Sequence, residues 1–229
     1  MARLDGFRER RRGRFGPVLL SILATIAVTV AAPETKTWAT VLAVMLGGTL
    51  WLAFLAAGAS RKVVWAGLVA WIVASGVMGV AAASDASFRN SLGPILNMVL
   101  IAAAAVAILR NLVQRGTITM SSVGGVLAVY LLIGLFFTYV YDSIGAITHA
   151  DPLQGEAPID LSAELYFTFV TQTTVGYGDY TPATNLVRGV AITQALVGQL
   201  YLVSVVALVV GNLGREAPRR QGRPPDDDS

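Results

Sequence analysis

Residues 174–179 read Thr-Val-Gly-Tyr-Gly-Asp, and they lie between two long apolar segments at roughly 123–141 and 185–211. Gly176 and Gly178 alternate with residues that carry side chains, and glycine adopts positive φ angles at little cost. A strand of this composition can turn successive carbonyl groups toward one side. In a membrane, a column of carbonyl oxygens is a site for a dehydrated cation. One copy supplies one wall of such a site, and four copies around an axis would enclose the cation.

The composition indicates an integral membrane protein. The chain is 55% hydrophobic and 14% charged, with a mean hydropathy of +0.64, whereas soluble domains average about 25% charged residues. The sequence contains no cysteine, so disulfides and thiol chemistry are excluded. No nucleotide-binding or EF-hand pattern is present in the sequence. We therefore expect neither an enzyme nor a nucleic-acid partner.

Six apolar runs predict an all-α membrane fold. Short connectors between the first four runs favour antiparallel neighbours in a peripheral bundle. The last two runs flank a shorter amphipathic segment at 161–173, so we expect a pore unit of outer helix, pore helix, filter strand and inner helix. The predicted spans are residues 17–32, 37–59, 63–83, 93–109, 123–141 and 185–211, with a hydrophilic outer loop at 142–159.

The basic residues predict the orientation of these spans. Most of the 17 Lys and Arg residues fall in the two tails and in the connectors after the second and fourth spans, whereas the alternate loops hold most of the acids. Excess Lys and Arg marks the cytoplasmic side, so both termini are expected inside and residues 174–179 enter from outside. We expect a basic tail at 1–16, a four-helix peripheral region at 17–115, a pore domain at 116–214 and a disordered tail at 215–229.

The Arg-rich segment 1–16 has three interpretations. It serves as a topology signal, it binds anionic lipid headgroups, or it begins a cleaved secretory peptide. We prefer the topology signal, because the apolar run that follows is longer than a usual signal-peptide core and more spans come after it.

Residues 174–178 resemble the selectivity filter of potassium channels of the tetrameric pore-loop superfamily. Residues 164–173, ELYFTFVTQT, resemble the pore helix of that family, and Asp179 and Pro182 follow at its usual positions. The resemblance covers residues 120–214. It implies that K⁺ passes along the carbonyls of the filter and that the chain forms a homotetramer. The residues it assigns to K⁺ are Thr174, Val175, Gly176, Tyr177 and Gly178.

The same resemblance assigns supporting residues around the filter. It places Asp179 as a brace at the outer mouth, and it places Tyr166 and Phe167 at aromatic positions that pack around the filter. Plain packing between helices is the alternative for both aromatics. Asp160 is a candidate N-cap for the pore helix, with Glu164 one turn later. Some channels carry a buried Glu behind the filter, and Val170 stands at that position here. A direct carboxyl–carboxylate contact from position 170 to Asp179 is therefore excluded.

The inner helix carries the candidate hinge and gate. Gly198 lies where the family often has an inner-helix glycine hinge. Gln199 either lines the central cavity or makes an interhelical hydrogen bond. By the spacing of the family, Val206 and Val210 are candidates for an apolar constriction that gates by dewetting. The only histidine, His149, is either an external pH sensor or a solvated turn residue.

The sequence favours a passive K⁺-selective channel without a charged voltage sensor. Voltage sensors carry arginines along their fourth span, and residues 93–109 contain no charged residue. We expect a multi-pass protein of the plasma membrane, bacterial in origin. Two alternatives stay open, namely a subunit of a potassium-uptake transporter and a non-conducting regulatory subunit. The stimulus that opens the gate is not readable from the sequence.

Overall fold

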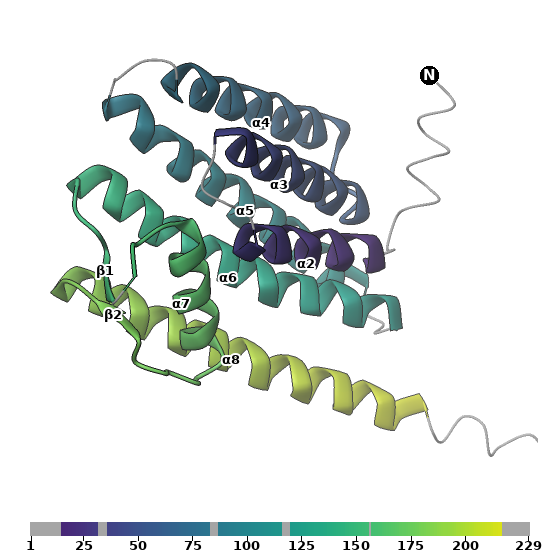
Figure 1. The fold of residues 1–229 in the computed structure, drawn as a ribbon. Helices are drawn as coiled ribbons and strands as arrows, with labels where there is room; N and C mark the ends of the chain where they lie inside the picture. The colour runs from purple at the N-terminus through teal and green to yellow at the C-terminus, as the bar shows by residue number, and fades with distance from the viewer. Residues whose placement is uncertain (1–14, 32–35, 83–86, 116–119, 156, 217–229) are drawn as a thin grey trace, which may run out of the picture.

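The computed structural model describes residues 15–31, 36–82, 87–115, 120–155 and 157–216, which form an all-α bundle with one small two-stranded sheet (Figure 1). This confirms the predicted fold class. Most of the predicted tails at 1–16 and 215–229 lies outside these ranges. The helices are α2 (Gly16–Ala31), α3 (Lys36–Ala56), α4 (Arg61–Ala82), α5 (Ser87–Arg115), α6 (Met120–Thr148), α7 (Leu161–Gln172) and α8 (Asn185–Glu216), and the strands are β1 (Leu153–Gly155) and β2 (Tyr180–Pro182).

Three of the described helices are long and apolar enough to cross a membrane. They contain the stretches Gly93–Gln114, Val123–Thr148 and Asn185–Val205. Shorter apolar stretches occur in α2, α3 and α4. The six-span arrangement therefore stays a prediction.

Several helices continue past the ends that the sequence predicted. Helix α5 begins at Ser87, inside the expected connector at 84–92, and α6 runs to Thr148 through much of the expected loop at 142–159. Helix α8 runs to Glu216, so residues 215 and 216 of the tail expected to be disordered are helical. Hydropathy marks the edge of the apolar core, whereas backbone hydrogen bonds decide where a helix ends. In α6 the Thr148 hydroxyl donates to the Ile144 carbonyl at 2.7 Å, so a polar residue is accommodated within the helix.

The peripheral helices are packed through small residues. Helix α2 contacts α3, α6 and the pore-unit helix α7. Phe15, at the start of α2, is fully buried, and a Cβ added at Gly125 of α6 would lie 2.8 Å from the Phe15 ring. In the same way, the Trp71 ring lies on Gly47 of α3, and the Trp71 indole donates to the Ala43 carbonyl at 2.8 Å. Close helix–helix approach of this kind is typical of membrane bundles.

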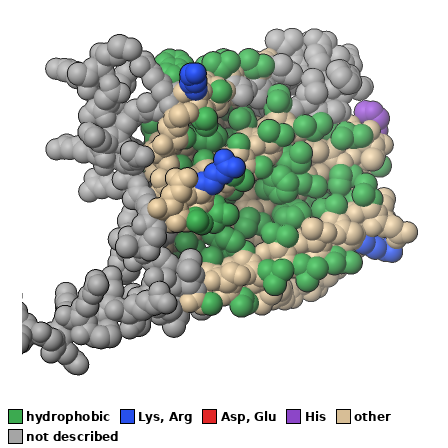
Figure 2. Space-filling model, turned by 180° about the vertical axis from the view of Figure 1, so that it is seen from behind, with side chains coloured by type: hydrophobic (Ala, Val, Ile, Leu, Met, Phe, Trp, Pro, Cys, Tyr) green, Lys and Arg blue, Asp and Glu red, His purple; other side chains and the backbone are tan. Residues whose placement is uncertain are grey.

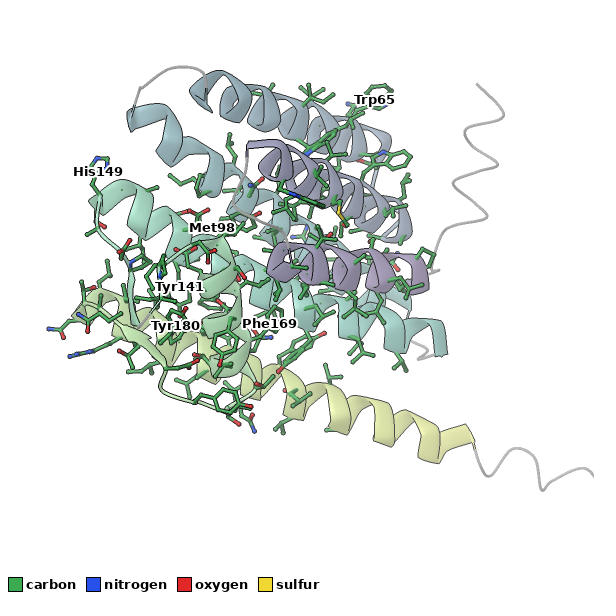
Figure 3. All side chains as sticks on the ribbon, viewed as in Figure 1. Trp65, Met98, Tyr141, His149, Phe169 and Tyr180 are labelled. Carbon is green, nitrogen blue, oxygen red and sulfur yellow. The ribbon has the colours of Figure 1, made fainter. Side chains whose placement is uncertain are left out.

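Apolar side chains cover much of the outer surface. Figure 2 shows one face of the molecule that is largely hydrophobic, with only scattered basic groups. Large apolar residues are exposed on α4, including Trp65 (labelled in Figure 3) and Ile72, and on α8, including Leu200. An exposed apolar surface of this extent is suited to lipid or to further protein subunits.

Helices α6, α7 and α8 form a unit of their own with the small sheet. Helix α7 is short and lies against both α6 and α8, and residues 174–178 follow its carboxyl end (Figure 1). The strands pair antiparallel, with Leu153 opposite Pro182 and Gly155 opposite Tyr180. A cluster of buried hydrophobic residues, which includes Tyr141 and Phe167, holds the three helices together. This unit fixes the position of the glycine-rich run.

Candidate functional site

Helix α7 is capped as the sequence predicted. Asp160 has extended backbone angles, and its carboxylate accepts the Ala163 N–H at 2.6 Å, so the N-cap prediction is confirmed. Glu164 lies in the first turn. The carboxyl end of α7 stops at Gln172, directly before the glycine-rich run. A helix carries partial negative charge at its carboxyl end, which favours a cation near residues 173 and 174.

The backbone of the glycine-rich run alternates between two conformations. Thr174, Gly176 and Gly178 have φ angles of 62°, 60° and 81°, whereas Val175 and Tyr177 between them do not have positive φ. An ordinary strand keeps negative φ at every residue, so this run has a backbone conformation of its own. The expectation of positive φ at the two glycines is confirmed. Positive φ at Thr174 was not predicted.

Hydrogen bonds from the end of α7 anchor the start of the run. The Thr174 N–H donates to the Thr171 carbonyl at 3.1 Å, and the Val175 N–H donates to the Val170 carbonyl at 3.0 Å. A non-glycine residue in the left-handed region is strained by about 1–2 kcal/mol. The contacts around Thr174 therefore hold a conformation that the isolated peptide would rarely adopt.

The run is not enclosed by its own chain. Residues 174–178 are all exposed, and the Tyr177 side chain is 72% exposed. A large aromatic side chain beside a well-packed helix is rarely left this open without a partner. Within a single chain these residues are therefore open to a further partner, and the carbonyl-lined site stays a prediction.

Aromatic residues join the far end of the run to the small sheet. The Tyr166 hydroxyl hydrogen-bonds to the Asp179 carboxylate, which raises the pKa of Tyr166 to about 12. The Tyr166 ring meets the Tyr180 ring edge-on at 5.9 Å between centroids. The Tyr180 ring in turn packs on Gly155 and occupies the space that a Cβ at this position would need. The structure therefore brings together Asp179 and Tyr166, two of the three predicted supporting residues.

Phe167 is placed differently. It meets Tyr141 edge-on at 5.4 Å and belongs to the cluster between the helices of the pore unit. This position matches the packing alternative for Phe167, although packing between these helices also positions α7.

Two buried glutamines connect α7 to its neighbours. The Gln172 amide donates to the Tyr130 carbonyl at 2.8 Å. The Gln194 amide donates to the Thr168 carbonyl at 2.7 Å, and its oxygen accepts the Tyr141 hydroxyl at 2.7 Å. Gln194 thereby links α6, α7 and α8 in one chain of hydrogen bonds. One signal for both residues is present in the sequence, namely a polar side chain within an apolar helix, but nothing in the sequence indicates their partners.

Gly198 lies in a close contact between helices. A Cβ at this position would be 2.7 Å from Gln172 Cγ, and α8 is helical on both sides of it. The structure therefore assigns Gly198 a packing role against Gln172 at the end of α7, and its role as a hinge stays a prediction.

The other inner-helix candidates are placed only in part. Gln199 is exposed on α8 within this single chain. Val206 and Val210 lie in the helical part of α8, but their side chains are outside the described part of the structure. The carboxyl-terminal half of α8 extends beyond the other helices (Figure 1). His149 is exposed at the end of α6, with a positive φ of 54° (Figure 3), which fits the turn-residue interpretation.

The comparisons with known proteins locate one family. Residues 125–215 match the family model Ion_trans_2, which is described as an ion channel. The matched range runs from α6 through α7 and the glycine-rich run to the end of α8. Neither the comparison with curated proteins nor the comparison with solved structures gave a match.

Proposed function

We propose that this chain, whose residues 125–215 are a domain of the ion-channel family, assembles as a homotetramer that conducts K⁺ selectively and passively. The observation that carries the proposal is the alternation of positive φ at Thr174, Gly176 and Gly178. Carbonyl oxygens that share one side replace the water shell of a K⁺ ion. The Thr174 hydroxyl would face the central cavity. The electrochemical gradient drives the movement, so no reaction is coupled to it.

The exposure of residues 174–178 in one chain supports a tetramer. A single run would supply oxygens from one direction only, and the Tyr177 side chain is 72% exposed. Closed cyclic symmetry places the same run on every side of one axis. In this arrangement Asp179, held by Tyr166, braces the outer mouth. We place the protein in the plasma membrane with both termini in the cytoplasm, as the distribution of basic residues favours.

A flux assay tests the function directly. The purified full-length protein is reconstituted into liposomes that contain KCl and are diluted into NaCl. An outward K⁺ gradient through a selective pore makes the interior negative, so a Rb⁺ tracer should accumulate until external K⁺ removes the gradient. Tracer Na⁺ should not accumulate. Equal entry of both tracers, or no entry with a folded tetramer, would contradict selective conduction.

The channel is expected to respond very little to voltage through its peripheral helices. Residues 93–109 of α5 carry no charge, and residues 37–59 and 63–83 carry no Asp or Glu to pair with a mobile Arg. Each elementary charge that crosses the field contributes ~2.3 kcal/mol per 100 mV, so no mobile charge means almost no voltage-dependent work. The measurement is a conductance–voltage curve in symmetric K⁺ with gating current after pore block. Several gating charges per subunit would refute this expectation.

External tetraethylammonium is expected to block weakly. Thr181 lies two residues past Asp179 and is exposed in β2, so the mouth lacks a ring of aromatics at this position. The nearby Tyr180 ring is engaged with Tyr166 and Gly155. Thr181→Tyr should strengthen block by at least about tenfold through cation–π contacts, whereas Thr181→Val should not. Tight block of the wild type that Thr181→Tyr leaves unchanged would show that this residue does not line the mouth.

A further inference from the structure

A cavity of about 480 Å³ lies between the end of α6, the turn that leads to β1 and the start of α7. It is separate from the filter run and lies at the end of the molecule where His149 is exposed (Figure 3). Its size falls within the range of sites for small molecules. The side chains that matter for its chemistry are Asp142, His149, Asp151 and Glu164.

Glu164 is the unusual member of this set. Its side chain is only 5% exposed, and its Oε2 atom has no hydrogen-bond partner within the described structure. The N-cap of α7 does not require it, because Asp160 already accepts the Ala163 N–H. A buried carboxyl oxygen without a donor is destabilising, and such atoms are rare in native proteins. Burial of this carboxyl beside the cavity therefore lowers the stability of the fold, and helix capping does not explain why it is there.

The cavity is rich in acceptors and poor in donors. Three carboxyl groups line it, and no Lys or Arg is among the described residues around it. Burial, with further contributions from Asp142, Asp160 and Asp151, raises the pKa of Glu164 to about 9. A positively charged donor would relieve both the missing hydrogen bond and the mutual repulsion of these carboxylates.

The geometry argues against a bare metal ion as the occupant. Within the described residues, no group of three or more acidic or His side chains is close enough to hold one. The volume also exceeds what a directly coordinated ion needs. A polyatomic cation with several N–H donors fits the space and the acceptors better, because it can reach carboxylates that are too far apart to share a metal.

We propose that this cavity binds a small organic cation of the guanidinium or primary ammonium class, with Glu164 Oε2 accepting one of its N–H groups. Asp151, which is exposed in the turn before β1, supplies charge at the entrance. Asp142 supplies a second acceptor from α6. Binding at this site does not depend on K⁺ conduction, so the two proposals are tested separately.

Binding at this site is linked to protons. With the raised pKa, Glu164 is neutral in the empty cavity at pH 7, and a bound cation favours its charged form, so the proton is released. The groups that face Glu164 are Asp142 from α6, Asp151 and His149 from the turn, and Asp160 from its own helix. Affinity should therefore rise with pH, by up to about tenfold per unit, and level off above pH 9.

The test uses guanidinium at millimolar concentrations, with urea as an uncharged molecule of the same shape. Binding to the purified full-length protein is measured by calorimetry at fixed ionic strength and saturating K⁺, which keeps the filter occupied. We expect one saturable guanidinium site per subunit and none for urea. Glu164→Gln keeps the shape of the side chain and should weaken binding by at least about tenfold.

Two further variants separate an effect on binding from an effect on folding. Asp151→Asn, in an exposed turn, should weaken binding several-fold without a demand on folding. Glu216→Gln is the matched control, since it removes a carboxyl at the last residue of α8, which does not line the cavity; it should bind within about threefold of the wild type. Equal binding by the wild type and Glu164→Gln, urea binding as tight as guanidinium, or no saturable binding would each overturn the proposal.

Discussion

Replacing Gly176 or Gly178 with alanine is expected to abolish K⁺-selective conduction. Their φ angles are +60° and +81°, and a Cβ at either position would meet no other atom within 4 Å. The change therefore acts on the backbone alone. It costs about 1–2 kcal/mol per residue, or about 4–8 kcal/mol over four subunits if the conformation is kept. Relaxation to negative φ would turn a carbonyl away from the axis.

Gly189→Ala provides the matched control for this substitution. Gly189 lies in α8, its added Cβ also meets nothing within 4 Å, and its φ is not positive. This variant should conduct as the wild type does, with equal K⁺/Na⁺ discrimination measured from reversal potentials. Size-exclusion chromatography confirms that each variant is assembled. If Gly176→Ala or Gly178→Ala forms the same assembly and discriminates as the wild type does, the assignment of the filter is wrong.

Gln194→Leu is expected to lower the thermal stability of the assembled protein markedly. The substitution removes the only described partner of the Tyr141 hydroxyl and the donor to the Thr168 carbonyl, both of which are buried. Leaving the Tyr141 hydroxyl unpaired costs about 1–3 kcal/mol, loss of the second hydrogen bond to the Thr168 carbonyl adds to this cost, and the loss is repeated in every subunit. Because Thr168 lies in α7, the position of the pore helix should also loosen.

A double-mutant cycle separates this network from simple loss of packing. Tyr141→Phe and Gln194→Leu should be less than additive when combined, because the double variant no longer buries an unpaired tyrosine hydroxyl. Thr193→Val, at the neighbouring exposed position, serves as the control and should leave the melting temperature nearly unchanged. If the Gln194→Leu variant has the same melting temperature as the wild type, these hydrogen bonds do not stabilise the structure.

The features of the site that were predicted correctly are those determined by residues close together in the sequence. Asp160 caps α7 through a hydrogen bond to a residue three positions away, and the positive φ of Gly176 and Gly178 follows from the absence of a Cβ. The order of helices in the pore unit followed from apolar runs. Each of these features depends on a few neighbouring residues, so the sequence contains the information needed to predict it.

The features that were missed depend on residues far apart in the chain. Gln172 and Gln194 are partnered by α6 and α7 residues that no periodicity identifies. The three-residue strands β1 and β2 are too short for a sequence pattern, and they pair because the outer loop returns beside Tyr180. Helix ends were predicted from hydropathy alone, whereas α5, α6 and α8 continue beyond the predicted apolar spans.

Recording single channels from the purified protein in a planar bilayer, with KCl on one side and NaCl on the other, tests the central claim most directly. We predict unitary currents that reverse near the K⁺ equilibrium potential, because four copies of residues 174–178 would surround the ion with carbonyl oxygens. Currents that reverse near zero would contradict K⁺ selectivity. Silence from a well-folded tetramer would contradict conduction itself.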